Sequence, residues 1–331
     1  MLELPKYYGK SAFDDALWAG NLGVDLFFAI SGFIIVAVSL QPRSLAPRIL
    51  PLEFLRRRFA RIIPVMWIAI ISYAAFRYLG RGGEDHMDSY LRALLLWPSG
   101  PLEPGQIWTL RQEWLFYLLF ALTTLVWPLR PVLYGWFLLP LFLWSIGALP
   151  EAANVPATLL GVITHASSVQ FGVGALVGFV YLRHPERFTA QPIPFGFPLL
   201  IALTCVLFAI GSLFHLERSP PEAVVTGAIS AVILVVALFV RPSSARFSKL
   251  GAVLGAASYS IYLFHPGLIS AQLGISSKLA PSAPVEVILV SISIATIFCC
   301  VMIYYFVERP ILQLFRGKPR APLAAANSAA H

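Results

Sequence analysis

The chain has 331 residues, of which 58% are hydrophobic and only 12% are charged, and its net charge is +8 at pH 7. Soluble domains carry about 25% charged residues, so this composition excludes a soluble globular domain. It predicts an all-α fold, a polytopic transmembrane helical bundle. The basic residues fall in particular loops, which argues against a nucleic-acid partner and for a lipid bilayer.

The first apolar stretch, residues 20–40, is long enough to cross a hydrocarbon core about 30 Å thick. It contains one carboxylate, Asp25, and a charge at that depth costs about 2.5–3.5 kcal/mol. We therefore expect Asp25 to face the interior of the bundle. Gly20, Gly23 and Gly32 would let another helix or a ligand come close.

Eight further spans follow, which gives a prediction of about nine. The predicted spans are residues 20–40, 62–79, 107–128, 131–149, 159–182, 194–214, 222–240, 250–271 and 285–307. Residues 1–19 form a polar N-terminal segment, residues 20–316 the membrane domain, and the Ala- and Pro-rich residues 317–331 a disordered tail. Within the long connection 80–106, the run LRALLLW is too short to span and predicts an interfacial or re-entrant piece.

The distribution of basic residues tests this count. The positive-inside rule places the loop after the first span in the cytoplasm. Alternation of nine spans then puts sixteen of the 24 Lys and Arg residues on that side. We expect an integral, multi-pass protein of a bacterial cytoplasmic (inner) membrane, with its carboxyl terminus in the cytoplasm.

Ionisable side chains gather in the outer halves of the predicted spans, where they are candidates for function. Asp25, Glu113 and His265 have similar expected depth on three spans, and we take them as candidate catalytic residues. A neutral imidazole can act as a general base towards a hydroxyl, and Glu113 could orient that imidazole or take the proton itself. Arg111 and His165 also fall in outer halves, and a purely structural charge network is the alternative. The residues expected to line the cavity are Ser31, Tyr117, Ser258, Tyr259 and Tyr262.

A second polar group lies at the cytoplasmic edge. Arg58 and Arg61 are one helical turn apart, and two guanidinium groups at that spacing could hold phosphate oxygens. The alternative is that they only set topology. Glu308 and Arg309, at the end of the last span, predict a structural ion pair. The three cysteines, Cys205, Cys299 and Cys300, lie in apolar spans and predict no metal site.

Six motifs in order make the chain similar to the membrane acyltransferase-3 family. They are GVDLFFAISGFII (23–35), RRRFARIIP (56–64), WTLRQEWLFYLLF (108–120), FGVGALVG (171–178), SYSIYLFHP (258–266) and VERP (307–310). The resemblance implies an enzyme that moves an acyl group, often acetyl, onto a hydroxyl of an extracytoplasmic or lipid-linked glycan. The WTL-x-x-E-W form resembles members that act on exopolysaccharides.

The resemblance also implies the other reactants. An acyl-CoA, acetyl-CoA first among them, would serve as co-substrate on the cytoplasmic side, with no further cofactor. Arg58 and Arg61 would bind this donor.

The family begins with an additional helix that carries an Arg and, ten residues later, a His taken as catalytic. In this chain only residues 1–19 precede the first span. We therefore expect that the natural first helix lies upstream of this chain. A transporter or flippase for a lipid-linked sugar, and a non-catalytic partner subunit, are the alternative functions.

Overall fold

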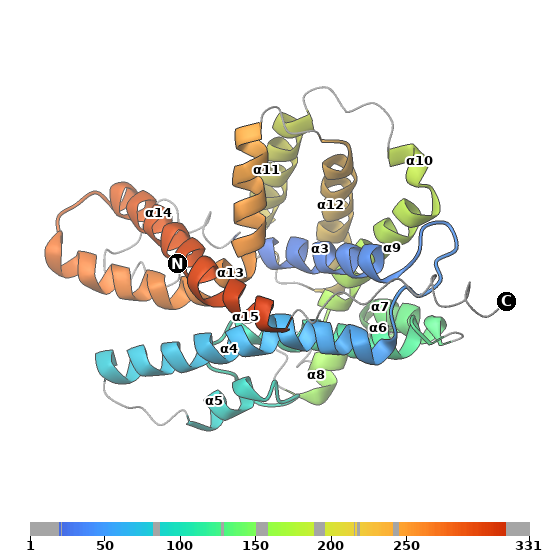
Figure 1. Cartoon of the computed structure of the whole chain (residues 1–331), viewed down its shortest axis with the longest axis horizontal. Coiled ribbons are helices and arrows are strands. Elements are labelled where there is room, and N and C mark those ends of the chain that lie inside the picture. The colour runs from blue at the N-terminus through green and yellow to red at the C-terminus, as the bar shows by residue number, and fades with distance from the viewer. Residues whose placement is uncertain are drawn as a thin grey trace.

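A computed structural model describes residues 20, 22–81, 87–126, 129–149, 158–188, 196–214, 216, 219–240 and 245–315 (Figure 1). Every regular element within these ranges is a helix, as the sequence predicts. The predicted N-terminal segment 1–19 and C-terminal tail 317–331 lie outside the described residues.

The helices follow the predicted spans closely. They are α3 (Leu22–Ser39), α4 (Pro51–Arg81), α5 (Met87–Leu94), α6 (Ile107–Thr123), α7 (Arg130–Ser145), α8 (Leu159–Thr164), α9 (Ser167–Arg183), α10 (Pro185–Phe188), α11 (Gly196–Phe214), α12 (Pro220–Phe239), α13 (Ala245–Leu279), α14 (Val285–Ile303), the π-helical η3 (Tyr304–Glu308) and α15 (Arg309–Phe315). Seven stretches in the described part are long and apolar enough to cross a membrane. The third and fourth predicted spans correspond to α6 and α7, of 17 and 16 residues, so the count of nine stays a prediction for these two.

Two helices are longer than predicted. The second predicted span begins at residue 62, whereas α4 begins at Pro51 and has 31 residues. The cluster from Arg56 to Arg61 therefore lies on a helix and not in a loop, which corrects the sequence prediction. The helix α13 has 35 residues and continues through Pro266 to Leu279, well beyond the end of the predicted span at residue 271.

The closest helix contact is between α3 and α9, where three glycines bring the backbones together. A Cβ atom at Gly174 would lie 1.8 Å from the carbonyl oxygen of Ala29, and one at Gly32 would lie 2.3 Å from that of Phe171. Gly178 approaches the Val36 side chain in the same way. Of the three glycines that the sequence analysis singled out, only Gly32 makes such a contact, because nothing lies within 4 Å of a Cβ at Gly20 or Gly23.

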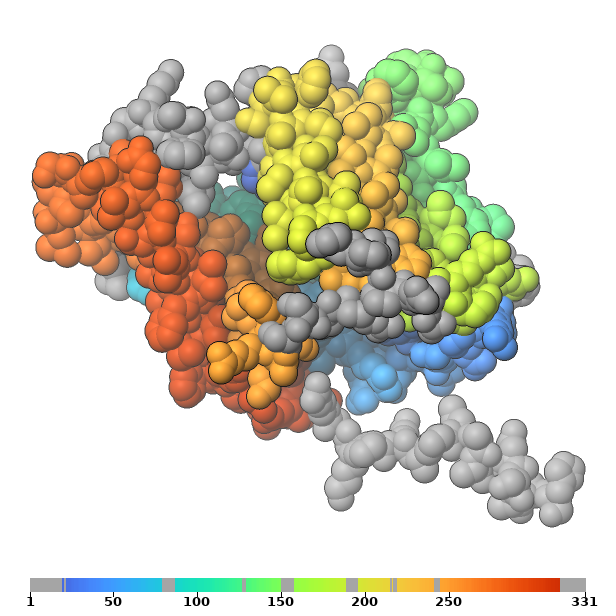
Figure 2. Space-filling model, turned by 90° about the horizontal axis from the view of Figure 1, so that it is seen from above, coloured from blue at the N-terminus to red at the C-terminus, as the bar shows by residue number. Residues whose placement is uncertain are grey.

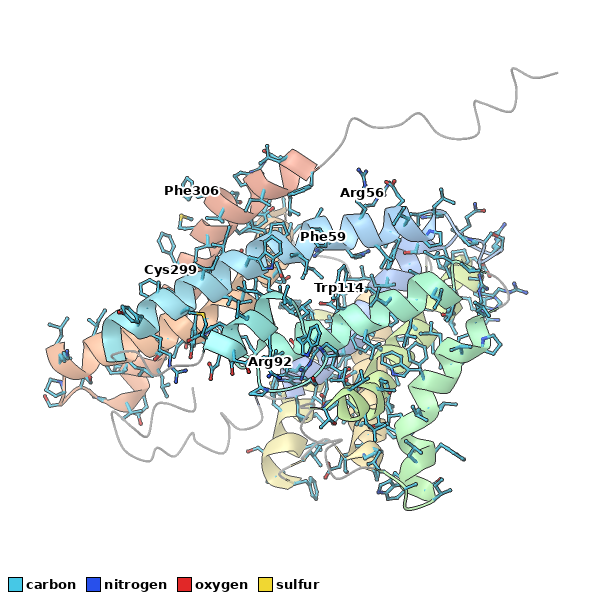
Figure 3. All side chains as sticks on the ribbon, turned by 90° about the horizontal axis from the view of Figure 1, so that it is seen from below. Arg56, Phe59, Arg92, Trp114, Cys299 and Phe306 are labelled. Atoms are coloured by element: carbon cyan, nitrogen blue, oxygen red, sulfur yellow. The ribbon has the colours of Figure 1, made fainter. Side chains whose placement is uncertain are left out.

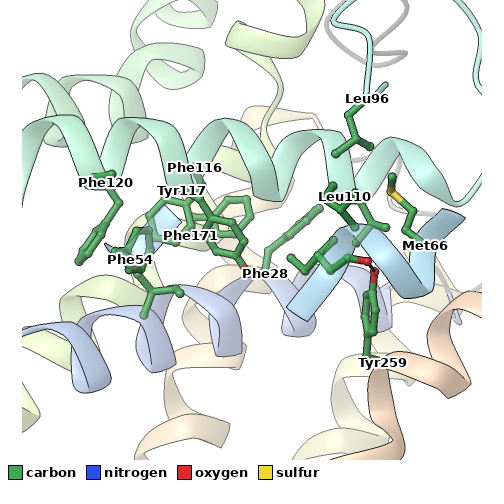
Figure 4. Close-up of a cluster of buried hydrophobic side chains, with 14 of the residues drawn as sticks. Phe28, Phe54, Met66, Leu96, Leu110, Phe116, Tyr117, Phe120, Phe171 and Tyr259 are labelled. Atoms are coloured by element: carbon green, nitrogen blue, oxygen red, sulfur yellow. Dashed lines mark hydrogen bonds between the residues drawn. The ribbon is translucent and has the colours of Figure 1, made fainter. Parts of the chain in front are cut away.

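Aromatic side chains fill the core around this crossing (Figure 4). The rings of Phe116 and Phe171 stack with their centroids 4.5 Å apart, and Phe28 lies 4.7 Å from Phe171. These three rings join α3, α6 and α9 into one core.

The hairpin of α13 and α14 projects away from that core (Figure 1). Its outer part holds a separate small cluster of Ile269, Leu273, Ile288 and Ile292. From above, α14 and the later part of α13 stand apart from α11 and α12 (Figure 2), whereas the start of α13 contacts α11 through the rings of Phe247 and Phe197, 6.5 Å apart.

Basic residues from three predicted cytoplasmic loops meet in one place. The Arg183 guanidinium donates to the carbonyl of Arg43 (3.1 Å), and Arg130 donates to the carbonyl of Leu45 (2.7 Å). The ends of α3, α7 and α9 therefore share one face of the molecule, as alternation of the spans requires.

The connection from α4 to α6 lies at the other end. Its helix α5 has eight residues, too few to span. Its side chains Leu91, Leu95 and Trp97 are exposed, whereas Ala93 is buried. Arg111 of α6 donates to the carbonyls of Trp97 and Gly100, and Arg77 pairs with Glu103 at 3.3 Å. These contacts fix the segment over the ends of α4 and α6.

The glycine crossing makes a direct prediction about stability. Gly174→Ala places a methyl group against a backbone carbonyl that cannot move aside, so we expect a loss of about 3 kcal/mol or more. The measurement is the thermal unfolding of purified protein in detergent. Gly135→Ala is the control, because a Cβ at Gly135 meets nothing within 4 Å and alanine favours the helix. Equal melting of both variants would contradict the close contact.

Candidate functional site

Glu113, the predicted catalytic carboxylate, lies at the centre of a buried polar cluster. It is 5% exposed on α6, and its Oε1 atom accepts hydrogen bonds from Ser31 Oγ (3.1 Å) and Tyr117 Oη (2.5 Å). Glu113 and Tyr117 are four residues apart on one helix, which places their side chains on one face. Two of the predicted cavity residues therefore contact the predicted carboxylate directly.

Arg58, a predicted donor-binding residue, packs against the same tyrosine. Its guanidinium carbon lies 5.6 Å from the centre of the Tyr117 ring and 5.4 Å from that of Phe54. Both distances allow cation–π attraction. The Nε atom of Arg58 is buried and has no hydrogen-bond partner within the described part of the chain. A buried donor without a partner is costly, so this atom is available to a ligand.

Arg61 lies one turn further along α4 and is exposed. The sequence predicts Glu113 in the outer half of the helical bundle and the arginines at its cytoplasmic edge. The structure brings Arg58 to Glu113 through Tyr117, because α4 begins eleven residues earlier than predicted and carries Arg58 on a helix that packs against α6. Other side chains on the same face of the molecule point away from the bundle. Arg56 is one of these, and Phe59 turns towards Trp114 instead (Figure 3).

Residues of α13 form a second wall of the cluster. The Tyr259 hydroxyl donates to the carbonyl of Ile62 on α4 (2.7 Å), and Ser260 Oγ donates to Glu308 Oε2 (2.5 Å). Figure 4 shows Tyr259 reaching from α13 to α4. Ser258, by contrast, is exposed and donates to the carbonyl of Gly255 on its own helix (2.9 Å), so the structure does not bring it to the predicted cavity.

Glu308 belongs to this cluster, although the sequence predicted only a structural ion pair for it. It is 2% exposed and faces the cluster, whereas Arg309 is exposed with its guanidinium 5.8 Å from the Tyr305 ring centre. The predicted ion pair between Glu308 and Arg309 is therefore wrong. Consecutive residues of a helix do not face each other, so Glu308 at the end of η3 points into the protein while Arg309 at the start of α15 does not.

His265 compensates for the backbone hydrogen bond that Pro266 removes. Proline frees the carbonyl of Tyr262, and His265 Nδ1 lies 2.9 Å from that oxygen and 3.0 Å from the carbonyl of Ile261. Both neighbours are acceptors only, so Nδ1 carries the proton. In the neutral ring Nε2 then has the lone pair that a general base needs.

Tyr262, the last of the predicted cavity residues, connects His265 to the start of α6. Its hydroxyl donates to the carbonyl of Gln106 (2.8 Å) and contacts the Thr109 hydroxyl. Its ring stacks on Phe27 at 5.6 Å. Gln106 in turn donates to the carbonyl of Leu263 (3.0 Å). His265 is therefore held beside the N-terminal end of α6, the helix that carries Glu113.

Asp25, the third candidate catalytic residue, lies outside the Glu113 hydrogen bonds. It is 2% exposed and has a polar partner of its own. It precedes Ser31 by six residues on α3, which is about 9 Å along the helix axis. Glu113 bonds Ser31, so the backbone of Asp25 lies nearly two helical turns from the part of α3 that meets Glu113. The sequence predicted that Asp25 and Glu113 lie at a similar depth.

His165 lies at a break between α8 and α9. Its Nδ1 accepts the backbone N–H of Ser167 (3.1 Å), and its ring packs 5.1 Å from Trp108. In the neutral ring the proton is therefore on Nε2, the opposite tautomer to that of His265. His165 thus presents a donor and His265 a base. Within the described residues no group of three metal-ligating side chains exists, and the three cysteines are free thiols.

The arrangement combines a buried carboxylate, hydroxyl groups, a positioned imidazole and two guanidinium groups. Carboxylate and imidazole suit proton transfer, and guanidinium groups suit phosphate or carboxylate recognition. The cluster can therefore support acid–base chemistry beside an anion-binding site.

Comparisons with known proteins agree with this chemistry. A family profile described as an acyltransferase domain matches residues 6–305. The exopolysaccharide production protein ExoZ of Rhizobium meliloti (strain 1021) is 29% identical over 316 residues, which cover 91% of this chain and 92% of ExoZ. The O-acetyltransferase OatA of Staphylococcus aureus (strain NCTC 8325 / PS 47) is 26% identical over 337 aligned residues, 90% of this chain and 54% of OatA.

This chain therefore spans about half the length of OatA. No solved structure gives a significant match. The profile covers nearly the whole chain, and the fold is a polytopic helical membrane protein. The chain belongs to the acyltransferase-3 family of membrane acyltransferases.

Proposed function

We propose that the protein moves an acetyl or similar acyl group from acyl-CoA to a hydroxyl of an extracytoplasmic or lipid-linked glycan. The names of ExoZ and OatA support an exopolysaccharide or related polysaccharide as the acceptor. The observation that carries the proposal is the contact of Arg58 with Tyr117, which is bonded to Glu113. It makes one continuous polar cluster from the arginines to the buried carboxylate.

In the proposed reaction a base removes the proton of the sugar hydroxyl as its oxygen attacks the thioester carbonyl. The C–S bond then breaks, and coenzyme A leaves as a thiol once it has received a proton. Glu113 is the proposed base of the central cluster, oriented by Ser31 and Tyr117. His265, whose Nε2 holds the lone pair, is the proposed base at the outer end.

The donor enters from the face that carries the basic turns, which we assign to the cytoplasm of a bacterium. There Arg58 Nε and the exposed Arg61 bind the phosphates of acyl-CoA. Guanidinium groups bind phosphate oxygens well because their planar fork of donors matches them. The acyl group then lies towards Tyr117 and Glu113.

The catalytic role of Glu113 is tested by Glu113→Gln. Glutamine keeps an oxygen that can accept the bonds of Ser31 and Tyr117, so the fold is expected to persist. Transfer of acetyl groups from acetyl-CoA to the cell's polysaccharide is expected to fall about 10²-fold, the usual loss for acid–base help. Glu103→Gln removes a carboxylate from the Arg77 pair near the surface and is the control. Normal transfer in Glu113→Gln would remove this carboxylate from the reaction.

His265→Ala is expected to lower transfer by a similar factor of about 10². The His265→Asn variant separates its two roles, because an amide can still donate to the Tyr262 carbonyl but cannot act as a base. If His265→Asn restores transfer to the wild-type rate, the imidazole only repairs the helix at Pro266.

Donor binding is tested by Arg61→Gln, assayed as initial rate against acetyl-CoA concentration. Contacts to the phosphates bind the ground and transition states alike, so the apparent KM should rise more than kcat falls. Arg56→Gln is the matched control, since Arg56 is exposed and pairs with Glu53 at 3.7 Å. An equal change in both variants would leave these arginines with a topological role only.

The proposed orientation is tested by fusing a reporter after residue 316. A reporter that is active only in the cytoplasm should work there, because the ends of α3, α7 and α9 gather the basic residues on one face. Activity of an exported reporter instead would overturn the orientation.

A further inference from the structure

Glu308 is the last residue of the π-helical turn at the end of α14. The backbone N–H of Arg309 bonds to the carbonyl of Tyr304, five residues earlier, and closes this turn. Such π-helical turns are frequent at functional sites. Here Glu308 is buried within the protein and Arg309 is exposed.

Two neighbouring residues of α13 place Glu308 near Arg61. Ser260 Oγ bonds Glu308, and the adjacent Tyr259 bonds the carbonyl of Ile62, the residue after Arg61. The two charged side chains therefore flank the same contact between α13 and α4.

Glu308 and Arg61 form no ion pair in the part of the chain that the structure describes. Among the described residues no carboxylate oxygen lies within 4.0 Å of an Arg61 nitrogen, and Arg61 is exposed. Arg61 lies ten residues, or about 15 Å along the helix axis, from the first residue of α4, Pro51. Its donors remain open to an anion, while Glu308 lowers the positive potential which that anion meets.

We propose that Glu308 tunes the arginine site, weakening its grip on the phosphates of coenzyme A so that the spent carrier leaves. The inference rests on the proposed function, in which Arg61 binds those phosphates. Acyl-CoA and free coenzyme A carry the same phosphates, so Glu308 weakens the binding of both alike, and the weaker binding speeds the release of free coenzyme A. Slow release of product limits kcat in many enzymes. Glu308 thus acts through its charge on the arginine site, as a positioning residue, and does not touch the reacting atoms.

The experiment measures binding of free coenzyme A to the purified, detergent-solubilised full chain by calorimetry. Glu308→Gln keeps the size of the side chain and an oxygen for Ser260, and removes only the charge. We expect its Kd for coenzyme A to fall about 3- to 10-fold at low salt, the scale of one partly screened charge. The gain should shrink at 0.5 M salt, because Arg61 is exposed. A role in packing alone would show no such salt dependence.

Two variants serve as controls. Glu308→Asp keeps the charge and is expected to bind coenzyme A with nearly wild-type affinity. Glu186→Gln removes one carboxylate from α10, beside the basic turn, and is expected to leave the Kd unchanged. Glu186 is exposed and pairs with His184 at 3.6 Å. Glu308→Met, of similar length, replaces the glutamine variant if that variant does not fold.

The outcomes separate this inference from the proposed function. Unchanged or weaker binding by a folded Glu308→Gln protein, or an equal gain in Glu186→Gln, overturns the inference and leaves the function standing. If wild-type protein and Arg61→Gln bind coenzyme A equally, or neither binds it, the arginines are not the donor site. The proposed donor site then fails, and the inference fails with it.

Discussion

The hydrogen bonds to the buried carboxylate of Glu113 are the interaction on which the site depends. A charged or polar group inside a hydrocarbon core is stable only where protein groups replace water. Ser31 from α3 and Tyr117 from α6 supply those groups. The position of α3 against α6 is therefore tied to the chemistry, because separating them would leave a buried acceptor without donors.

The same constraint explains how the neighbouring helices are arranged. Arg58 is stabilised by the faces of Phe54 and Tyr117, so one tyrosine serves both the cation and the carboxylate. On the other wall, Ser260 satisfies Glu308 while Tyr259 joins α13 to α4. These polar side chains therefore also fix how neighbouring helices are aligned. The same residues can form a functional site and a structural charge network at once.

Sequence reasoning predicted the fold class and most helix positions, because apolar length and the placement of basic residues are direct consequences of the bilayer. It also found Glu113, Ser31 and Tyr117, which the structure brings together. It assigned the Arg56 to Arg61 cluster to a loop because the charged start of α4 is not apolar enough to be recognised as part of a span. It paired Glu308 with Arg309 although consecutive residues of a helix do not face each other, and the partner of Glu308, Ser260, lies 48 residues away in the sequence. The depth of Asp25 was wrong for a simpler reason: distances from the span ends ignore the tilt and offset of packed helices.

The glycine crossing of α3 and α9 has a mechanical consequence. Where a carbonyl oxygen occupies the space of a missing Cβ, as at Gly174 and Gly32, the two helices have no side chains between them that could change rotamer. They can slide or rotate past each other only by losing the contact altogether, so they behave as a single rigid body. The α13–α14 hairpin, in contrast, meets the core through side chains: Tyr262 stacks on Phe27, and hydrogen bonds join Tyr259 to Ile62 and Gln106 to Leu263. Such bonds can be exchanged for bonds to water or to a substrate. The hairpin can therefore shift against the α3–α9 block more readily than α3 and α9 can shift against each other, and Arg61 of α4 precedes the residue at which hairpin and α4 meet.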